Sequence, residues 1–127
     1  MKILIDTSIW IGFFRKKPES KILIELLKAD RVLTHPFVIG ELQMGSLPGL
    51  RNQVLTDLQN LPSIKNPPES IISEFIELMK LHGSGLSYVD AALLCTAKAN
   101  AVNFLTSDKL LLRYAKELDL QPDIQKI

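Results

Sequence analysis

The stretch Ile3-Leu4-Ile5 constrains the fold more than any other part of this chain, because it is apolar at consecutive positions. A strand with one face in water alternates apolar and polar residues, whereas a strand buried on both faces of a parallel sheet is continuously apolar. The run ends at Asp6, and Thr7 and Ser8 follow as residues that favour a helix N-cap. The sequence therefore predicts a buried parallel strand that leads directly into a helix.

The rest of the chain alternates short apolar runs with longer segments of helical periodicity. Further strands are predicted at 32–33 and 102–106, and edge strands at Ile64 and at 123–124. Helices are predicted after Asp6, from Pro18, from Pro36 to about Gly45, from about Pro48 to Leu58, over 71–79, from Ser87, and from 107–108. Such alternation predicts a parallel sheet with helices on both faces and right-handed crossovers.

Length and cysteine content indicate one domain spanning residues 1–127, without disulfides. The only cysteine, Cys95, lies in an apolar stretch, so we expect a reduced, buried thiol rather than a nucleophile. The start of the chain lacks the pattern of a signal peptide, and no stretch reaches the roughly 20 apolar residues of a membrane helix. We therefore expect a cytoplasmic protein with no membrane segment.

The charge balance limits the kinds of nucleic-acid binding that this chain can carry out. Its formal net charge is only +1, whereas proteins that hold nucleic acid mainly through charge are strongly basic. This argues against tight, sequence-reading DNA binding by the chain alone. It is compatible with a nuclease, because bound metal ions would supply positive charge where the phosphate lies.

Four acidic residues are placed where a parallel sheet binds ligands. Asp6 and Asp108 each follow a predicted strand, so both should lie at the carboxyl edge of the sheet. Asp90 falls in the first turn of the helix that leads into the second of these strands, and Glu41 in the helix after 32–33. Isolated charges beside core segments are costly unless they are paired or bind a metal. Oxygen ligands without His or Cys suit Mg²⁺ or Mn²⁺ rather than zinc.

Each of these acids also has a structural interpretation. Asp6, Asp90 and Asp108 fit N-cap or first-turn positions, and Glu41 fits an ordinary solvated helix position. The metal-site hypothesis therefore depends on the four occurring together. Neighbouring hydroxyl residues either orient ligands and bind phosphate or cap helices, and they are Thr7, Ser8, Thr106 and Ser107.

Several other residues are candidates for contact with the substrate. Lys109 and Arg113 lie one turn apart beyond Asp108 and fit either phosphate contact or a solvated helix face. The basic run 15–17 is typical of a solvated helix end. Trp10 is typical of a core residue or an interface residue. The lone histidines His35 and His82 favour structural roles.

Four segments of this chain resemble the motifs of PIN-domain nucleases, and most of all those of the VapC toxins of bacterial toxin–antitoxin pairs. The likeness covers essentially the whole chain, and the motifs occur in the family's order. The segments are Leu4-Ile-Asp-Thr-Ser-Ile-Trp-Ile11, Val38-Ile-Gly-Glu-Leu42, Gly85-Leu-Ser-Tyr-Val-Asp-Ala91 and Leu105-Thr-Ser-Asp-Lys109. The stretch Thr34-His-Pro-Phe37 also resembles one VapC subgroup.

The resemblance implies a three-layer α/β/α fold with a short parallel sheet of strand order 3-2-1-4-5. It implies an Mg²⁺-dependent endoribonuclease, with Mn²⁺ as a substitute, whose catalytic and metal-binding residues are Asp6, Glu41, Asp90 and Asp108. It also implies inhibition by a partner antitoxin and formation of a homodimer. The candidate substrate-binding residues are Thr7, Ser107, Lys109 and Arg113. The apolar residues of 71–79 and 110–112 also favour a homodimer.

Three other functional classes were considered. A phosphatase of the haloacid dehalogenase type needs a second Asp two residues after Asp6, where this chain has Ser8. A receiver domain needs adjacent acids after the first strand, which this chain lacks. A catalytically silent binding protein on the same fold stays open as an alternative.

Overall fold

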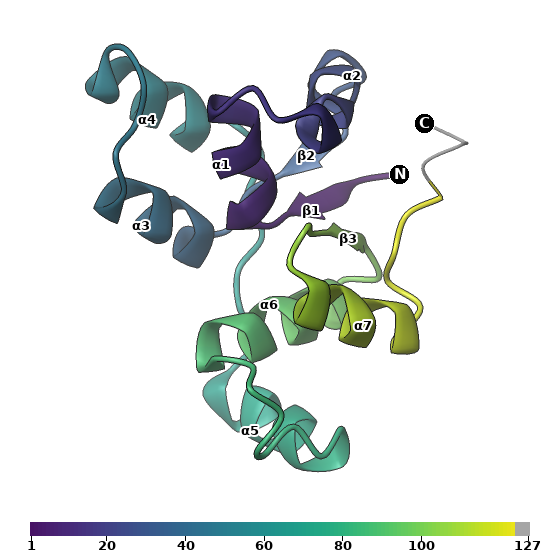
Figure 1. Ribbon diagram of the computed structural model, residues 1–127. Helices are drawn as coiled ribbons and strands as arrows, with labels where there is room; N and C mark the ends of the chain where they lie inside the picture. The colour runs from purple at the N-terminus through teal and green to yellow at the C-terminus, as the bar shows by residue number, and fades with distance from the viewer. Residues whose placement is uncertain (124–127) are drawn as a thin grey trace.

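The computed structural model describes residues 1–123, which form a parallel three-stranded sheet of order β2-β1-β3 (Figure 1). The central strand β1, Ile3–Ile5, pairs with β2, Val32–Leu33, on one side and with β3, Asn103–Leu105, on the other. All three residues of β1 are fully buried. This confirms the two-sided burial predicted from its continuous apolar run.

The strand order differs slightly from the expected 3-2-1-4-5 because, within residues 1–123, neither predicted edge position is part of a strand. Next to β2, Thr34 makes only an isolated parallel bridge with Ser63. The Thr34 N–H donates to the Pro62 carbonyl over 2.8 Å, and the Ile64 N–H donates to the Thr34 carbonyl over 3.0 Å. Extending this ladder backwards would require an N–H at residue 62, which proline lacks.

The opposite edge of the sheet ends for the same reason. The Phe104 N–H donates to the Leu120 carbonyl over 2.8 Å, which is the first hydrogen bond of a parallel ladder. The next bond would come from the N–H of residue 122, and that residue is proline. Residues 121–123 are accordingly not in a strand, and Ile124, part of the predicted edge strand, lies outside the described residues.

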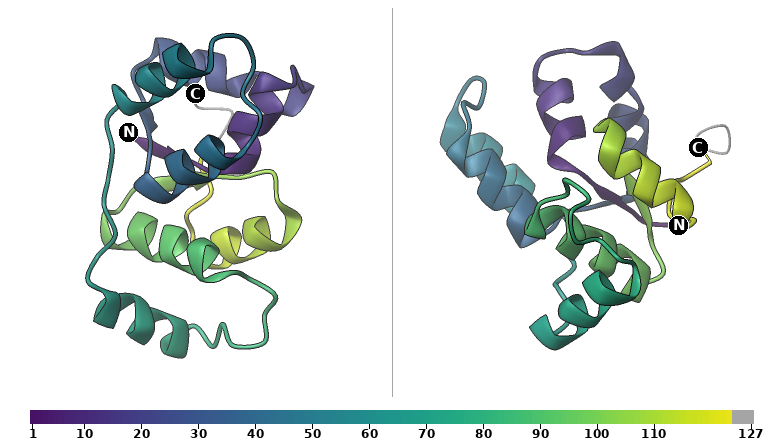
Figure 2. Two further views of the ribbon diagram at one scale, coloured as in Figure 1. Left: turned by 90° about the vertical axis from the view of Figure 1, so that its left-hand side faces the viewer. Right: turned by 60° about the horizontal axis from the view of Figure 1, so that its bottom comes forward.

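Helices cover both faces of the sheet, giving the predicted three layers (Figures 1 and 2). One face carries α1 (Thr7–Phe14), the 3₁₀ turn η1 (Pro18–Ser20), α2 (Ile22–Lys28), α3 (Pro36–Met44) and α4 (Arg51–Gln59). The other face carries α5 (Glu69–Leu78), α6 (Tyr88–Ala99) and α7 (Lys109–Glu117). Within residues 1–123, no helix has both the length and the apolar composition needed to cross a membrane.

Two helices begin later than predicted. Pro18 opens only the short turn η1, and the α-helix starts at Ile22. The helix predicted from about Pro48 starts at Arg51 because Gly49 has φ of +60°, a left-handed conformation that interrupts a helix.

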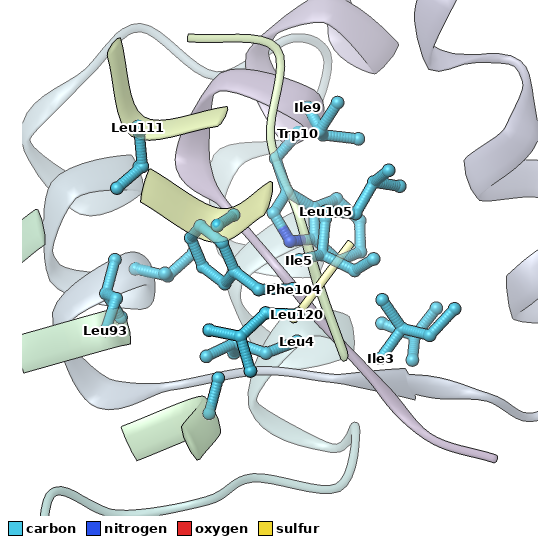
Figure 3. Close-up of a cluster of buried hydrophobic side chains, with 14 of the residues drawn as sticks. Ile3, Leu4, Ile5, Ile9, Trp10, Leu93, Phe104, Leu105, Leu111 and Leu120 are labelled. Carbon is cyan, nitrogen blue, oxygen red and sulfur yellow. The ribbon is translucent and has the colours of Figure 1, made fainter. Parts of the chain in front are cut away.

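The core holds the sheet in the middle of the molecule. Figure 3 shows side chains of β1 and β3 packed among Trp10 of α1, Leu93 of α6 and Leu111 of α7, all of which are buried. Burying a large apolar side chain stabilises a fold by about 1.5–3 kcal/mol. The sheet is therefore a rigid base from which its carboxyl edge presents side chains.

Candidate active site

Asp6 lies at the carboxyl edge of the sheet, at the junction of β1 and α1. Its N–H donates to the Leu105 carbonyl over 2.9 Å, which holds the ends of β1 and β3 side by side. The residue is only 5% exposed. The predicted neighbouring position of the two strands that precede Asp6 and Asp108 is therefore confirmed.

The Asp6 carboxylate accepts two hydroxyl hydrogen bonds. Its Oδ2 atom accepts from Ser8 Oγ and from Thr106 Oγ1, each over 2.7 Å. Both hydroxyls in turn accept from backbone amides, Ser8 from the Ser107 N–H and Thr106 from the Asp108 N–H, over 3.1 Å in each case. Although Asp6 occupies the N-cap position of α1, its side chain makes no cap hydrogen bond. The N-cap interpretation therefore does not account for this carboxylate.

Burial raises the pKa of Asp6, and the negative charge of Asp90 raises it further. Hydrogen bonds from Ser8, Thr106 and the Thr7 backbone act in the opposite direction, but burial is the largest effect. The ion pairs recorded within residues 1–123 are Lys28–Glu25 and Arg113–Glu117, so no Lys or Arg compensates Asp6 there. A buried carboxylate with an acidic neighbour and no cation is typical of functional sites.

Asp90 forms the predicted capping box at the start of α6. Its Oδ2 atom accepts from the Ser87 N–H over 3.2 Å, and its own N–H donates to Ser87 Oγ over 3.1 Å. The capping interpretation is therefore confirmed. It does not exclude a second role, because the Asp90 charge also acts on the pKa of Asp6.

Asp108 is the N-cap residue of α7. Its Oδ1 atom accepts from the Leu111 N–H over 2.9 Å, so the capping interpretation holds here too. The residue is exposed, and within residues 1–123 its second carboxylate oxygen makes no hydrogen bond. A cap that occupies one oxygen leaves the other available to a ligand.

Glu41 extends from α3 and is exposed, with a hydrogen bond to α1. Its Oε1 atom accepts from Thr7 Oγ1 over 2.6 Å. No pattern in the sequence predicts this pair, because 34 positions separate the two residues. Thr7 thus holds Glu41 next to the start of α1, where Asp6 lies.

The basic candidates lie on the exposed side of α7. Lys109 is the first residue of the helix and is exposed, and it forms no ion pair within residues 1–123. Arg113 Nε lies 3.6 Å from Glu117 Oε1, and the guanidinium carbon of Arg113 lies 5.4 Å from the centre of the Tyr114 ring. Exposed pairs of this kind contribute little to stability, so Arg113 can exchange Glu117 for another anion.

The donor chemistry of these acids fits a hard divalent cation, but their side chains are not gathered into a finished metal centre. Among residues 1–123, no three Asp, Glu, His or Cys side chains are grouped closely enough to hold one ion. Three of the four acids are engaged elsewhere, Asp90 and Asp108 by helix caps and Glu41 by Thr7. Asp6 and Asp90 are the pair whose charges interact, so a cation between them would relieve an existing repulsion.

A buried polar network connects the helices that carry Glu41 and Asp90. His35 is fully buried, and its Nδ1 atom accepts from the Phe37 N–H over 2.9 Å, which caps α3. Its Nε2 atom lies 2.6 Å from Asn66 Oδ1, which also accepts from Thr96 Oγ1 of α6 over 3.0 Å. The structural role predicted for His35 is confirmed, whereas its partners Asn66 and Thr96 were missed because neither belongs to a recognisable motif.

Cys95 is buried, and burial raises the pKa of its thiol. A raised pKa disfavours the thiolate, which is the reactive form of cysteine. The expectation of an inert, buried thiol is therefore confirmed.

Two comparisons of the sequence place this arrangement in a family. Residues 3–117 match the family model of the PIN domain. Ribonuclease VapC32 of Mycobacterium tuberculosis is 37% identical to this chain over 110 residues, a match that covers 86% of each protein.

Known structures share the fold at lower identity. PAE2754 from Pyrobaculum aerophilum has a TM-score of 0.65 at 15% identity, covering 99% of this chain and 91% of that one. FitAcB from Neisseria gonorrhoeae has a TM-score of 0.59 at 20% identity, covering 90% of this chain and 93% of that one. FitAB bound to an IR36 DNA fragment has a TM-score of 0.62 at 20% identity and 90% coverage of both chains. The chain belongs to the PIN-domain family, and ribonuclease VapC32 is one of its relatives.

Proposed function

We propose that this PIN-domain protein is a divalent-metal-dependent endoribonuclease and the toxin of a toxin–antitoxin pair. The observation that carries the proposal is the Asp6 carboxylate, buried at the carboxyl edge of the sheet beside Asp90 without a compensating cation within residues 1–123. The identity to a protein named as a ribonuclease supports RNA as the substrate.

The four acids have distinct roles in this scheme. Asp6, Glu41, Asp90 and Asp108 would hold Mg²⁺, or Mn²⁺ in its place, directly or through water. The bound ion would polarise a phosphate oxygen and lower the pKa of a water. That water would attack the phosphorus while the bond from phosphorus to the 3′ oxygen breaks, and the leaving 3′ oxygen would take a proton from solvent. Asp90 or Asp108 would accept the proton of that water, since the helix cap of each occupies one carboxylate oxygen and leaves the other for this task.

Phosphate groups of the RNA would be bound mainly at the start of α7. Lys109 is the first residue of that helix, and its exposed ammonium group would attract a phosphate, since the Asp108 carboxylate already caps the Leu111 N–H. Ser107 is exposed just before the helix, and Arg113 follows one turn later. Thr7 would have two tasks in the scheme, because it donates to Glu41 and would also contact the phosphate.

We further propose that the protein acts in the cytoplasm as a homodimer that a cognate antitoxin inhibits. The dimer proposal is supported by α5, where Leu78 is 80% and Ile71 42% exposed. The run 110–112 supports it less, because Leu111 is buried in the protein's own core and its two neighbours are partly covered.

The proposal is tested by comparing the wild type with Asp6→Asn on a panel of tRNA, rRNA and mRNA fragments. The wild type should cut RNA with Mg²⁺ and stop in EDTA, whereas Asp6→Asn should lose about 10²-fold or more of the rate. Asp30→Asn, an exposed acid in a turn after α2, is the matched control and should cut normally. Cleavage that persists in EDTA, or normal cleavage by Asp6→Asn, would reject the metal scheme.

The toxin part of the proposal has its own test in living cells. Expression of the wild type without a partner should arrest the growth of a bacterial host, and Asp6→Asn at the same soluble level should not. Arrest that is relieved by co-expression of the neighbouring small gene would identify the antitoxin. Equal growth of both strains would favour a housekeeping nuclease or a silent binding protein.

A further inference from the structure

We infer that a small pocket between α1 and the end of α3 binds a nucleotide of the RNA next to the one that is cut. The inference rests on the proposed ribonuclease function and deepens it. The pocket has a volume of about 170 Å³. Its lining includes Ile11, Phe14, Arg15, Glu41, Ser46 and Leu47.

The position of the pocket connects it to the candidate active site. Glu41 forms part of its wall, and the same carboxylate accepts from Thr7 Oγ1 at the start of α1. The pocket and the acid site therefore share one side chain. An RNA strand whose phosphate lies at the acids would bring an adjacent nucleotide to this pocket.

The lining combines the groups that recognise a nucleotide. Single-stranded RNA is bound by stacking of its bases on aromatic and apolar surfaces, with positive charge along the backbone. Phe14, Ile11 and Leu47 supply the apolar walls. Arg15 is exposed and forms no ion pair within residues 1–123, so its guanidinium is available to a phosphate.

The Phe14 ring of the pocket packs against two other aromatic rings of α1. Phe14 stacks on the buried Trp10 with ring centres 6.2 Å apart, and its ring centre lies 5.7 Å from that of Phe13. A ring supported in this way loses little conformational freedom when a base stacks on it. Its rigidity favours binding of a planar base.

A second, larger pocket that Phe14 also lines fits RNA less well. It has a volume of about 270 Å³ and is lined by apolar residues such as Leu27 and Leu58, with Asp57 as its charged residue. Each lining holds one carboxylate, Glu41 in the smaller pocket and Asp57 in the larger, but only the smaller lining also has a cation, Arg15, to attract a phosphate. The charges therefore assign the nucleotide to the pocket beside Glu41.

The test uses a fluorescein-labelled RNA oligonucleotide and the full chain, and it measures binding in EDTA as well as cleavage in Mg²⁺. Arg15→Gln should weaken binding and raise KM about tenfold, while kcat stays within about twofold, because binding of ground state and transition state is lost equally. The slope of log affinity against log salt should fall by about 0.7, the value for one phosphate contact on a single strand. Lys17→Gln removes the same charge two residues away, outside the pocket lining, and should change neither quantity.

Phe14→Leu tests the base-stacking surface separately. It should weaken RNA binding in EDTA about tenfold whichever base lies beside the cut, as expected for loss of a stacking contact of about 1–3 kcal/mol. A melting temperature above the assay temperature shows that Phe14→Leu is folded during the measurement. Arg15→Gln changes an exposed residue and so tests the pocket without altering the core.

The outcomes separate this inference from the proposed function. If the wild type cuts RNA but Arg15→Gln matches Lys17→Gln in affinity and salt slope and Phe14→Leu keeps the wild-type affinity, the pocket is not a nucleotide subsite and the ribonuclease proposal stands. If the wild type neither cuts nor binds RNA, both fail. If it binds RNA with the predicted effect of Arg15→Gln but does not cut, the pocket is a site for an RNA nucleotide but not a subsite of a nuclease, and the enzyme proposal fails.

Discussion

The Thr106 hydroxyl donates to the Asp6 carboxylate over 2.7 Å, although 100 positions separate the two residues. The same hydroxyl accepts from the Asp108 N–H over 3.1 Å, so a chain of hydrogen bonds runs from the start of α7 to the end of β1. Thr106 is therefore a positioning residue that joins the first and the last of the four acids.

Replacing Thr106 by valine removes this hydroxyl while keeping the side-chain shape. Thr106→Val should raise the pKa of Asp6, since a hydrogen bond that lowers it is lost. It should also destabilise the fold by about 1–3 kcal/mol, because the Asp108 amide loses its acceptor. The acid limb of the pH profile of kcat/KM should therefore move to higher pH. Thr56→Val, on exposed α4, is the control and should leave that profile unchanged.

The charge of Asp6 should make the protein less stable without metal. Since the folded-state pKa of Asp6 is raised, its contribution to stability is present below the unfolded pKa of about 3.9 and is lost as pH rises through the folded pKa. At pH 7 in EDTA, Asp6→Asn should therefore melt at or above the wild-type temperature. Mg²⁺ should stabilise the wild type by about 2.7 kcal/mol at a hundred times its Kd, and the variant by much less. A variant that melts lower in EDTA and keeps the full Mg²⁺ gain would contradict the carboxylate scheme.

The helix caps at Asp90 and Asp108 allow catalysis and stability to be separated. Asparagine caps a helix about as well as aspartate. The free energies of unfolding of Asp90→Asn and Asp108→Asn should therefore lie within about 0.5 kcal/mol of the wild-type value. Both should lose about 10²-fold of RNA cleavage, as should Glu41→Gln. Asp108→Ala should in addition lose about 1 kcal/mol, because the hydrogen bond to the Leu111 N–H disappears. Cleavage and denaturant unfolding measured on the same preparations test this pattern.

The buried imidazole of His35 should make stability depend on pH. Burial lowers its folded-state pKa, so its contribution is present above the unfolded pKa of about 6.5 and is lost as pH falls towards the folded pKa. A proton on Nδ1 would also face the Phe37 N–H that this atom accepts. Urea unfolding between pH 8 and 5 should show a loss of stability that His35→Asn reduces. The exposed His82→Asn should keep the wild-type dependence.

The exposed apolar side of α5 should form the dimer contact. Light scattering at tens of micromolar should give the mass of a dimer for the wild type and of a monomer for Leu78→Lys, since a charge is costly in an apolar interface. Leu50→Lys is closely matched, because Leu50 is 79% and Leu78 80% exposed, and it should remain dimeric. A monomeric wild type would reject the dimer proposal.

Local patterns in the sequence were sufficient to predict much of this protein. The apolar run Ile3–Ile5 predicted the central strand, and the pairing of Ser87 with Asp90 predicted the capping box. Both features depend on interactions within a few residues, so backbone preference and side-chain spacing determine them. The topology rules of parallel sheets predicted that β1 and β3 end at the same edge, and the strand order implied by the family resemblance predicted that these two strands are neighbours.

The tertiary structure decided which side chains meet and how far the sheet extends. The hydrogen bonds of Thr7 to Glu41 and of His35 to Asn66 depend on how helices pack, which no spacing in the sequence encodes. The sheet stops at Pro62 and Pro122 because the strand register places each proline where a ladder N–H is needed. The strand register results from the packing of the whole core. The sequence by itself therefore determined the helices, the strands and the edge of the sheet where the acids lie. Only the folded chain determined the hydrogen-bond partners of these acids.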